Sequence, residues 1–166
     1  MPLEAGAKAP QIETDYPDND GEPHNLVKVL EKGPMVLGIY KSSCAASKAM
    51  MPVLNRIEDA YGEQGATVIG VAQDSPNVTK SFKRRTGTDY TILIEGDDYP
   101  ISREFDIFAT PTVYVIDKDG TITYTTMGFM RNQVNDIGNA VADILGVDRV
   151  EIVSDKDDEI PAFVPG

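Results

Sequence analysis

The stretch that decides the fold runs from Met35 to Lys48 and reads Met35-Val-Leu-Gly-Ile-Tyr-Lys-Ser-Ser-Cys-Ala-Ala-Ser-Lys48. It opens with a continuous apolar run of strand length, which predicts a central strand covered on both faces. A helical pattern begins near Ala45. Cys44, the only cysteine of the chain, therefore lies where the strand gives way to the helix. Because free N–H groups and the positive end of a helix dipole stabilise a thiolate, Cys44 is a candidate nucleophile.

The surroundings of Cys44 favour a chemical role over that of a small buried hydrophobe, which is the usual role of a lone cysteine. Cys44 and Ser47 have the spacing of a C-x-x-C redox site whose second cysteine is replaced by serine. Lys41 and Lys48 flank the thiol, and their charges would favour the thiolate. These features predict a functional thiol.

Length, charge and composition limit the class of protein. A chain of 166 residues with 41% hydrophobic content fits a single domain that needs no disulfide. The net charge of −12 argues against a nucleic-acid partner. No apolar segment approaches the roughly 20 residues that cross a bilayer, so we expect no membrane association. The first residues of the sequence do not resemble a secretory signal, so we expect a cytoplasmic location. One cysteine and one histidine cannot form a zinc cluster, and calcium-loop and phosphate-binding glycine motifs are absent, so we expect no metal and no cofactor.

The rest of the chain alternates between strand and helix patterns. Ser42 or Ser43 is expected to cap the helix after Cys44, and Pro52 should kink it. Val78 and Phe82 should face the sheet from a later helix. The expected strands are 35–40, 67–72, 90–94, 112–116 and 121–126, with a further short strand possible at 11–14. The expected helices are 25–32, one that begins near Ala45 and ends at Gly62 or Gly65, one opening at Ser75-Pro76, 101–106 and one closed by Gly146.

This order predicts parallel strands joined by helices, with an antiparallel hairpin formed by the last two strands. Residues 1–6 are expected to be an irregular lead-in and residues 7–146 a single domain. Residues 147–166 form an acidic tail, for which a flexible end is the first expectation. The alternative is docking of its apolar side chains, Ile160, Phe163 and Val164, on the body or on a neighbouring subunit.

Three motifs, together with this order, resemble the thioredoxin superfamily. They are Tyr40-Lys-Ser-Ser-Cys-Ala-Ala-Ser-Lys48, Met51-Pro52 and Ala109-Thr-Pro-Thr-Val-Tyr-Val-Ile-Asp-Lys-Asp-Gly120. The resemblance is closest to the redoxin branch, meaning the TlpA and ResA type thiol-disulfide oxidoreductases and the AhpC/TSA peroxiredoxin group. It implies an α/β fold, a thioredoxin-like three-layer sandwich whose mixed central sheet is flanked by helices.

The resemblance also assigns roles to residues. Pro111 would be in the cis form and pack against the thiol, and the backbone of Thr110 would pair with a bound peptide or disulfide. Cys44, Ser47 and Pro111 are the expected catalytic residues, with Ser47 orienting the sulfur. The expected substrate-binding residues are Tyr40, Lys41, Ser43, Lys48 and Thr110.

Departures from the family pattern restrict the chemistry. Ser47 cannot form a disulfide, so a complete Cys-x-x-Cys cycle is excluded and an external thiol or a thioredoxin-type reductant must complete turnover. Met50 stands where TlpA and ResA relatives often carry an acidic residue. Lys41 and Pro111 stand where peroxiredoxins carry a threonine or serine and an arginine. We therefore expect thiol-disulfide exchange at Cys44, with a one-cysteine peroxidase and a non-catalytic binding module as alternatives. The substrate would be a disulfide or a peroxide, and the chain a monomer or a homodimer.

Overall fold

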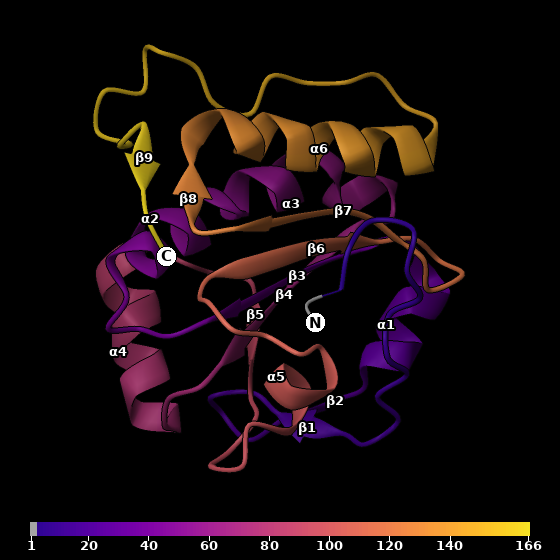
Figure 1. Ribbon diagram of the computed structural model, residues 1–166, viewed down its shortest axis with the longest axis vertical. Coiled ribbons are helices and arrows are strands. Elements are labelled where there is room, and N and C mark those ends of the chain that lie inside the picture. Colours follow the sequence, from indigo (N-terminus) through magenta and orange to yellow (C-terminus); the bar gives the residue numbers. More distant parts are fainter. Residues whose placement is uncertain (1–2) are drawn as a thin grey trace.

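A five-stranded mixed sheet forms the centre of the molecule, as the computed structural model of residues 3–166 shows (Figure 1). In spatial order its strands are β5 (Thr91–Ile94), β4 (Thr67–Ala72), β3 (Met35–Tyr40), β6 (Thr112–Ile116) and β7 (Ile122–Met127). The first three run parallel to one another, whereas β6 is antiparallel to both β3 and β7. All six residues of β3 are buried, so the predicted central strand and the predicted hairpin are confirmed.

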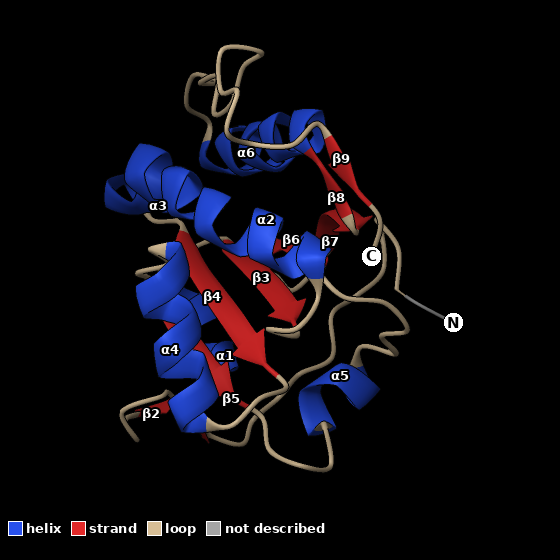
Figure 2. Ribbon diagram, turned by 90° about the vertical axis from the view of Figure 1, so that its left-hand side faces the viewer, coloured by secondary structure: helices blue, strands red, loops and turns tan. Residues whose placement is uncertain are grey.

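Helices cover both faces of this sheet. On one face lie α2 (Ala45–Val53), α3 (Asn55–Tyr61), α4 (Pro76–Thr86) and α6 (Arg131–Leu145), and on the other lie α1 (Leu26–Lys32) and α5 (Pro100–Glu104) (Figures 1 and 2). The short elements are β1 (Tyr16–Pro17), β2 (Pro23–His24), η1 (Gly62–Gln64), β8 (Phe129–Met130) and β9 (Phe163–Val164). The predicted α/β three-layer sandwich is confirmed. None of the helices in the described part of the chain has the length and apolarity to cross a membrane.

Alternation along β3 divides its side chains between two cores. Val36 and Tyr40 join the core beneath α2, α3 and α6, while Leu37 and Ile39 join the core beneath α1 and α5. Between them Gly38 leaves room for the helix above, because a Cβ at this position would lie 3.1 Å from the Met51 Cε atom. The helix that follows Cys44 therefore packs directly against the central strand.

Pro52 interrupts the long helix, as the sequence predicts. The chain leaves α2 at Val53 and starts α3 at Asn55. Proline has no N–H and clashes with the preceding turn, so hydrogen bonding is irregular here. The buried Tyr90 hydroxyl donates a 2.6 Å hydrogen bond to the Met51 carbonyl and so satisfies a backbone acceptor at the break.

Two expectations about local structure are wrong. Residues 11–14 form no strand, because side chains take up part of their backbone bonding: the Asn25 amide donates to the Glu13 carbonyl at 2.8 Å. Val78 is 41% exposed instead of facing the sheet. Its neighbour Thr79 turns inward with Phe82, and the Thr79 hydroxyl donates to the Ser75 carbonyl at 2.9 Å.

The acidic tail is packed on the body, so the first expectation of a flexible end is wrong. Ile152, Val153 and Ile160 are all less than 9% exposed and belong to the core beneath α6. Asn135 on α6 holds the first two through hydrogen bonds to their backbone. The expected docking is found at Ile160 and at the half-buried Val164, whereas Phe163 is 60% exposed.

Candidate functional site

Cys44 is the N-cap residue of α2, with extended backbone angles, and the helix proper begins at Ala45. The expected caps, Ser42 and Ser43, are two and one positions too early, respectively. The physical reason is a tight turn, in which the Cys44 N–H donates to the Lys41 carbonyl at 3.0 Å and delays the helix start. The thiol is consequently at the helix N-terminus, where N–H groups without helical partners face it.

The fold brings Cys44 to the Thr110-Pro111 peptide. Because β6 runs antiparallel to β3, the start of β6 lies beside the end of β3, with Ile39 opposite Thr112. The residues just after β3 and just before β6 therefore meet. The Cys44 thiol donates a hydrogen bond to the Thr110 carbonyl at 3.3 Å, and the Thr110-Pro111 bond is cis, as the family resemblance implies.

The electrostatics around Cys44 favour the thiolate. Partial burial on its own would raise the pKa of the thiol, but hydrogen bonds from neighbouring groups outweigh it and hold the pKa below its usual range. The main contributions come from the Ser47 N–H, the Ser47 and Thr110 hydroxyls and the Ala46 N–H. The sulfur remains partly exposed, so it combines an increased thiolate fraction with access to reagents.

Ser47 and Asp74 shape the loop that precedes the thiol. The Ser47 side chain is fully buried, and its hydroxyl accepts a 3.4 Å hydrogen bond from the Lys41 N–H. Asp74, in the loop after β4, accepts a 2.8 Å hydrogen bond from the Ser42 N–H. The sequence reasoning missed Asp74. Its position just after a strand parallel to β3 was the available signal, since the carboxyl ends of parallel strands share one edge of the sheet.

The expected substrate-binding residues have diverse environments. Lys41, Ser43 and Lys48 are exposed on the loop and first turns around the thiol. Tyr40 is fully buried instead, with its ring 4.8 Å from that of Phe82, and burial raises the pKa of its hydroxyl far above the ordinary value. This position argues against the substrate contact that the sequence suggested for the Tyr40 side chain.

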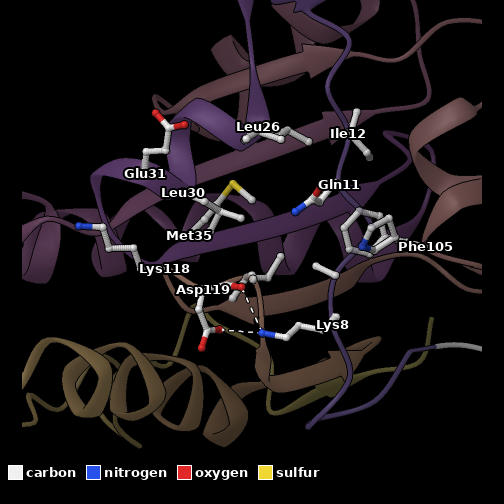
Figure 3. A pocket seen from close by; sticks show the side chains of 15 residues that line it. Lys8, Gln11, Ile12, Leu26, Leu30, Glu31, Met35, Phe105, Lys118 and Asp119 are labelled. Carbon is white, nitrogen blue, oxygen red and sulfur yellow. Dashed lines mark hydrogen bonds and ion pairs between the residues drawn. The ribbon is translucent and has the colours of Figure 1, made fainter.

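An apolar cavity lies away from the thiol. It has a volume of about 550 Å³ and is lined by Met35, at the opposite end of β3 from Cys44. Figure 3 shows Leu26, Leu30 and Met35 around it, with the Lys8–Asp119 ion pair at one side. Within residues 3–166, no three His, Cys, Asp or Glu side chains gather as a metal site.

A mixed sheet with a thiol at the N-terminus of its first long helix, facing a cis-proline, defines a thioredoxin-fold protein. A family model described as the AhpC/TSA family matches residues 5–125. The chain belongs to the AhpC/TSA family, in the redoxin branch of the thioredoxin superfamily.

Individual relatives agree with this placement. Thiol-disulfide oxidoreductase ResA of Geobacillus thermodenitrificans is 26% identical over 117 residues, which cover 70% of this chain and only 66% of ResA. The thioredoxin domain of a thiol-disulfide oxidoreductase from Bacteroides vulgatus superposes with a TM-score of 0.73 at 18% identity, covering 86% of this chain and 99% of that domain. Peroxidoxin BcpB of Mycobacterium tuberculosis superposes with a TM-score of 0.70 at 19% identity, covering 88% of this chain and 99% of BcpB. The two structures share the fold with this chain.

Proposed function

We propose that this protein is a thiol-disulfide oxidoreductase in which Cys44 is the single nucleophile and an external thiol completes each turnover. The observation that carries the proposal is the placement of the partly exposed Cys44 thiol at the start of α2, 3.3 Å from the carbonyl that precedes cis-Pro111. The lowered pKa of the thiol and the similarity to ResA support it.

The reaction balances without a second cysteine. The Cys44 thiolate attacks one sulfur of a substrate disulfide, a bond forms between Cys44 and that sulfur, and the other sulfur leaves as a thiolate that takes up a proton. An external thiolate, from a small molecule or a thioredoxin-type protein, then attacks the mixed disulfide. It forms a new disulfide with the substrate sulfur and releases Cys44 as a thiolate.

Neighbouring groups have defined tasks in this scheme. Ser47 and the N–H groups at the start of α2 would stabilise the Cys44 thiolate before it attacks the substrate and again when it leaves the mixed disulfide. Pro111 is buried and would form the wall of the groove beside the sulfur. The exposed ammonium groups of Lys41 and Lys48 would attract an anionic thiol substrate.

A turnover assay with two oxidants tests the proposal. Bis(2-hydroxyethyl) disulfide or hydrogen peroxide is supplied together with glutathione, and glutathione oxidation is followed. We expect catalysis of disulfide exchange that disappears in Cys44→Ser, with peroxide consumed no faster than by a free thiol. Faster peroxide turnover would support the peroxidase alternative instead, and no turnover with either oxidant would leave the binding-module alternative.

We also propose a cytoplasmic location, which cell fractionation would test.

A further inference from the structure

The last residues of the chain lie beside the candidate active site. Residues 162–166 form a strap, whose β9 strand pairs antiparallel with β8. The N–H of Arg131, the first residue of α6 and the one directly after β8, donates to the Ala162 carbonyl at 2.9 Å and extends this pairing. β9 also packs against α2, the helix that begins next to Cys44 (Figures 1 and 2).

The end of the strap reaches the carbonyl that the thiol uses. A Cβ placed on Gly166 would lie 2.8 Å from the Thr110 carbonyl oxygen and 3.2 Å from the Gly128 Cα atom. The same Thr110 oxygen accepts the hydrogen bond of the Cys44 thiol at 3.3 Å. The strap therefore covers the backbone beside the sulfur, and the contact is too close to admit a side chain at position 166.

The strap itself is attached through few buried side chains. Just before it, Ile160 is buried, and its carbonyl accepts a 3.0 Å hydrogen bond from the Arg131 guanidinium. Beyond that anchor Val164 is half-buried against the core, whereas Ala162, Phe163, Pro165 and Gly166 are exposed. A mostly exposed segment that follows a buried anchor can lift without unfolding the core, because few buried contacts are broken.

We propose that the strap is a specificity determinant, an inference that rests on the thiol-disulfide exchange proposed above. Extended peptides bind by adding a strand to exposed backbone, and here the strap already occupies the backbone around Thr110. Small disulfides need only the partly exposed Cys44 sulfur. The strap thus admits small disulfides and disfavours peptide disulfides, which must first displace it.

The test compares two reagents that release the same chromophore. The small one is neutral 4,4′-dithiodipyridine, and the large one is an uncharged extended octapeptide whose central cysteine carries a thiopyridyl disulfide. If the strap is closed about 90% of the time, deleting residues 162–166 raises the peptide rate about tenfold, because the competent fraction rises to one. The rate with dithiodipyridine should change by less than about twofold, since its path to the sulfur is already open.

Matched glycine variants keep the test independent of the deletion. Gly128→Ala places a Cβ 3.0 Å from the Gly166 nitrogen and should lift the strap. Gly146→Ala is its control, because Gly146 has a similar positive φ, +69° against +72°, with no described atom within 4 Å of the added Cβ. Both variants carry the same backbone strain, but only Gly128→Ala should raise the peptide rate.

Equal changes in rate with both reagents would overturn the inference. A peptide rate that stays unchanged in Gly128→Ala or in the deletion variant would also overturn it. Slow reaction of Cys44 with dithiodipyridine in every variant would contradict the proposed function instead. In that case the ratio of the two rates still decides whether the strap discriminates between the reagents.

Discussion

Replacing Asn135 by alanine should weaken the attachment of the segment that carries the strap. Asn135 lies on α6, and its side chain makes three hydrogen bonds to the backbone of the C-terminal segment. The amide oxygen accepts from the Ile152 N–H at 2.7 Å and from the Val153 N–H at 3.0 Å, and the amide nitrogen donates to the Val153 carbonyl at 2.9 Å. One side chain therefore satisfies three partly buried backbone groups.

The expected cost follows from these contacts. Each hydrogen bond contributes about 1 kcal/mol net, so Asn135→Ala should lower the free energy of unfolding by about 3 kcal/mol. Detachment of the segment does not avoid this cost, because exposing the buried Ile152 and Val153 side chains costs roughly 1.5–3 kcal/mol each. For a chain of this size, about 3 kcal/mol corresponds to a fall in Tm of roughly 6–12 °C.

Thermal unfolding monitored by circular dichroism measures the fall, and hydrogen exchange at the Ile152 and Val153 amides reports on the segment itself. Asn132→Ala is the matched control, since Asn132 is exposed on the same helix and its loss should cost less than about 0.5 kcal/mol. Equal Tm values for the two variants, or unchanged amide protection in Asn135→Ala, would refute the reasoning.

Three further variants probe the site and the core. Ser47→Ala removes a hydroxyl that favours the thiolate, so the pKa of Cys44 should rise and its alkylation profile should move to higher pH. Tyr90→Phe leaves the Met51 carbonyl without its buried donor and should cost about 1–3 kcal/mol in urea unfolding. Burial raises the pKa of the Glu95 carboxyl despite its hydrogen bonds, so the folded state binds this proton more tightly than the unfolded state. The free energy of unfolding should therefore fall as pH rises from about 4.3, the ordinary pKa of a glutamate, through the raised pKa of Glu95. When Tm is measured against pH, the Glu95→Gln variant should lack this fall.

Each of these variants has a control or a contradicting result. Ser43→Ala changes an exposed hydroxyl beside the thiol and should leave the alkylation profile in place. Tyr114→Phe removes a buried hydroxyl that has no hydrogen-bond partner in the described structure, so it should cost less than Tyr90→Phe. Parallel Tm curves for Glu95→Gln and the unmodified protein would contradict the assigned cause of the pH dependence.

The central fold could be predicted because its signals are local. The apolar run from Met35 to Tyr40 is too continuous for a surface strand, and the pattern after Cys44 is helical up to the break at Pro52. These features depend on residues close in sequence. The approach of Pro111 to the thiol was expected only through the family resemblance, and the hydrogen bond from Cys44 to the Thr110 carbonyl, 66 residues away, was not expected.

What could not be predicted depends on distant partners. The role of Cys44 as the N-cap of α2 is set by the turn at Lys41, which composition alone does not distinguish from a serine cap. Docking of the acidic tail requires Asn135 to meet Ile152, 17 residues later, and nothing in the acidic composition of the tail indicates this contact. Charge suggested a solvated end, whereas a few apolar and amide contacts determine its position.

The most direct test of the account is the rate of Cys44 alkylation by iodoacetamide as a function of pH. Since Cys44 is the only cysteine, the label reports on one site. The account predicts a midpoint below the value of about 8.5 for a free thiol, and labelling at neutral pH that is faster than in the same chain unfolded. A midpoint at or above that value, with slow labelling of the folded protein, would contradict the claim that Cys44 is an activated nucleophile.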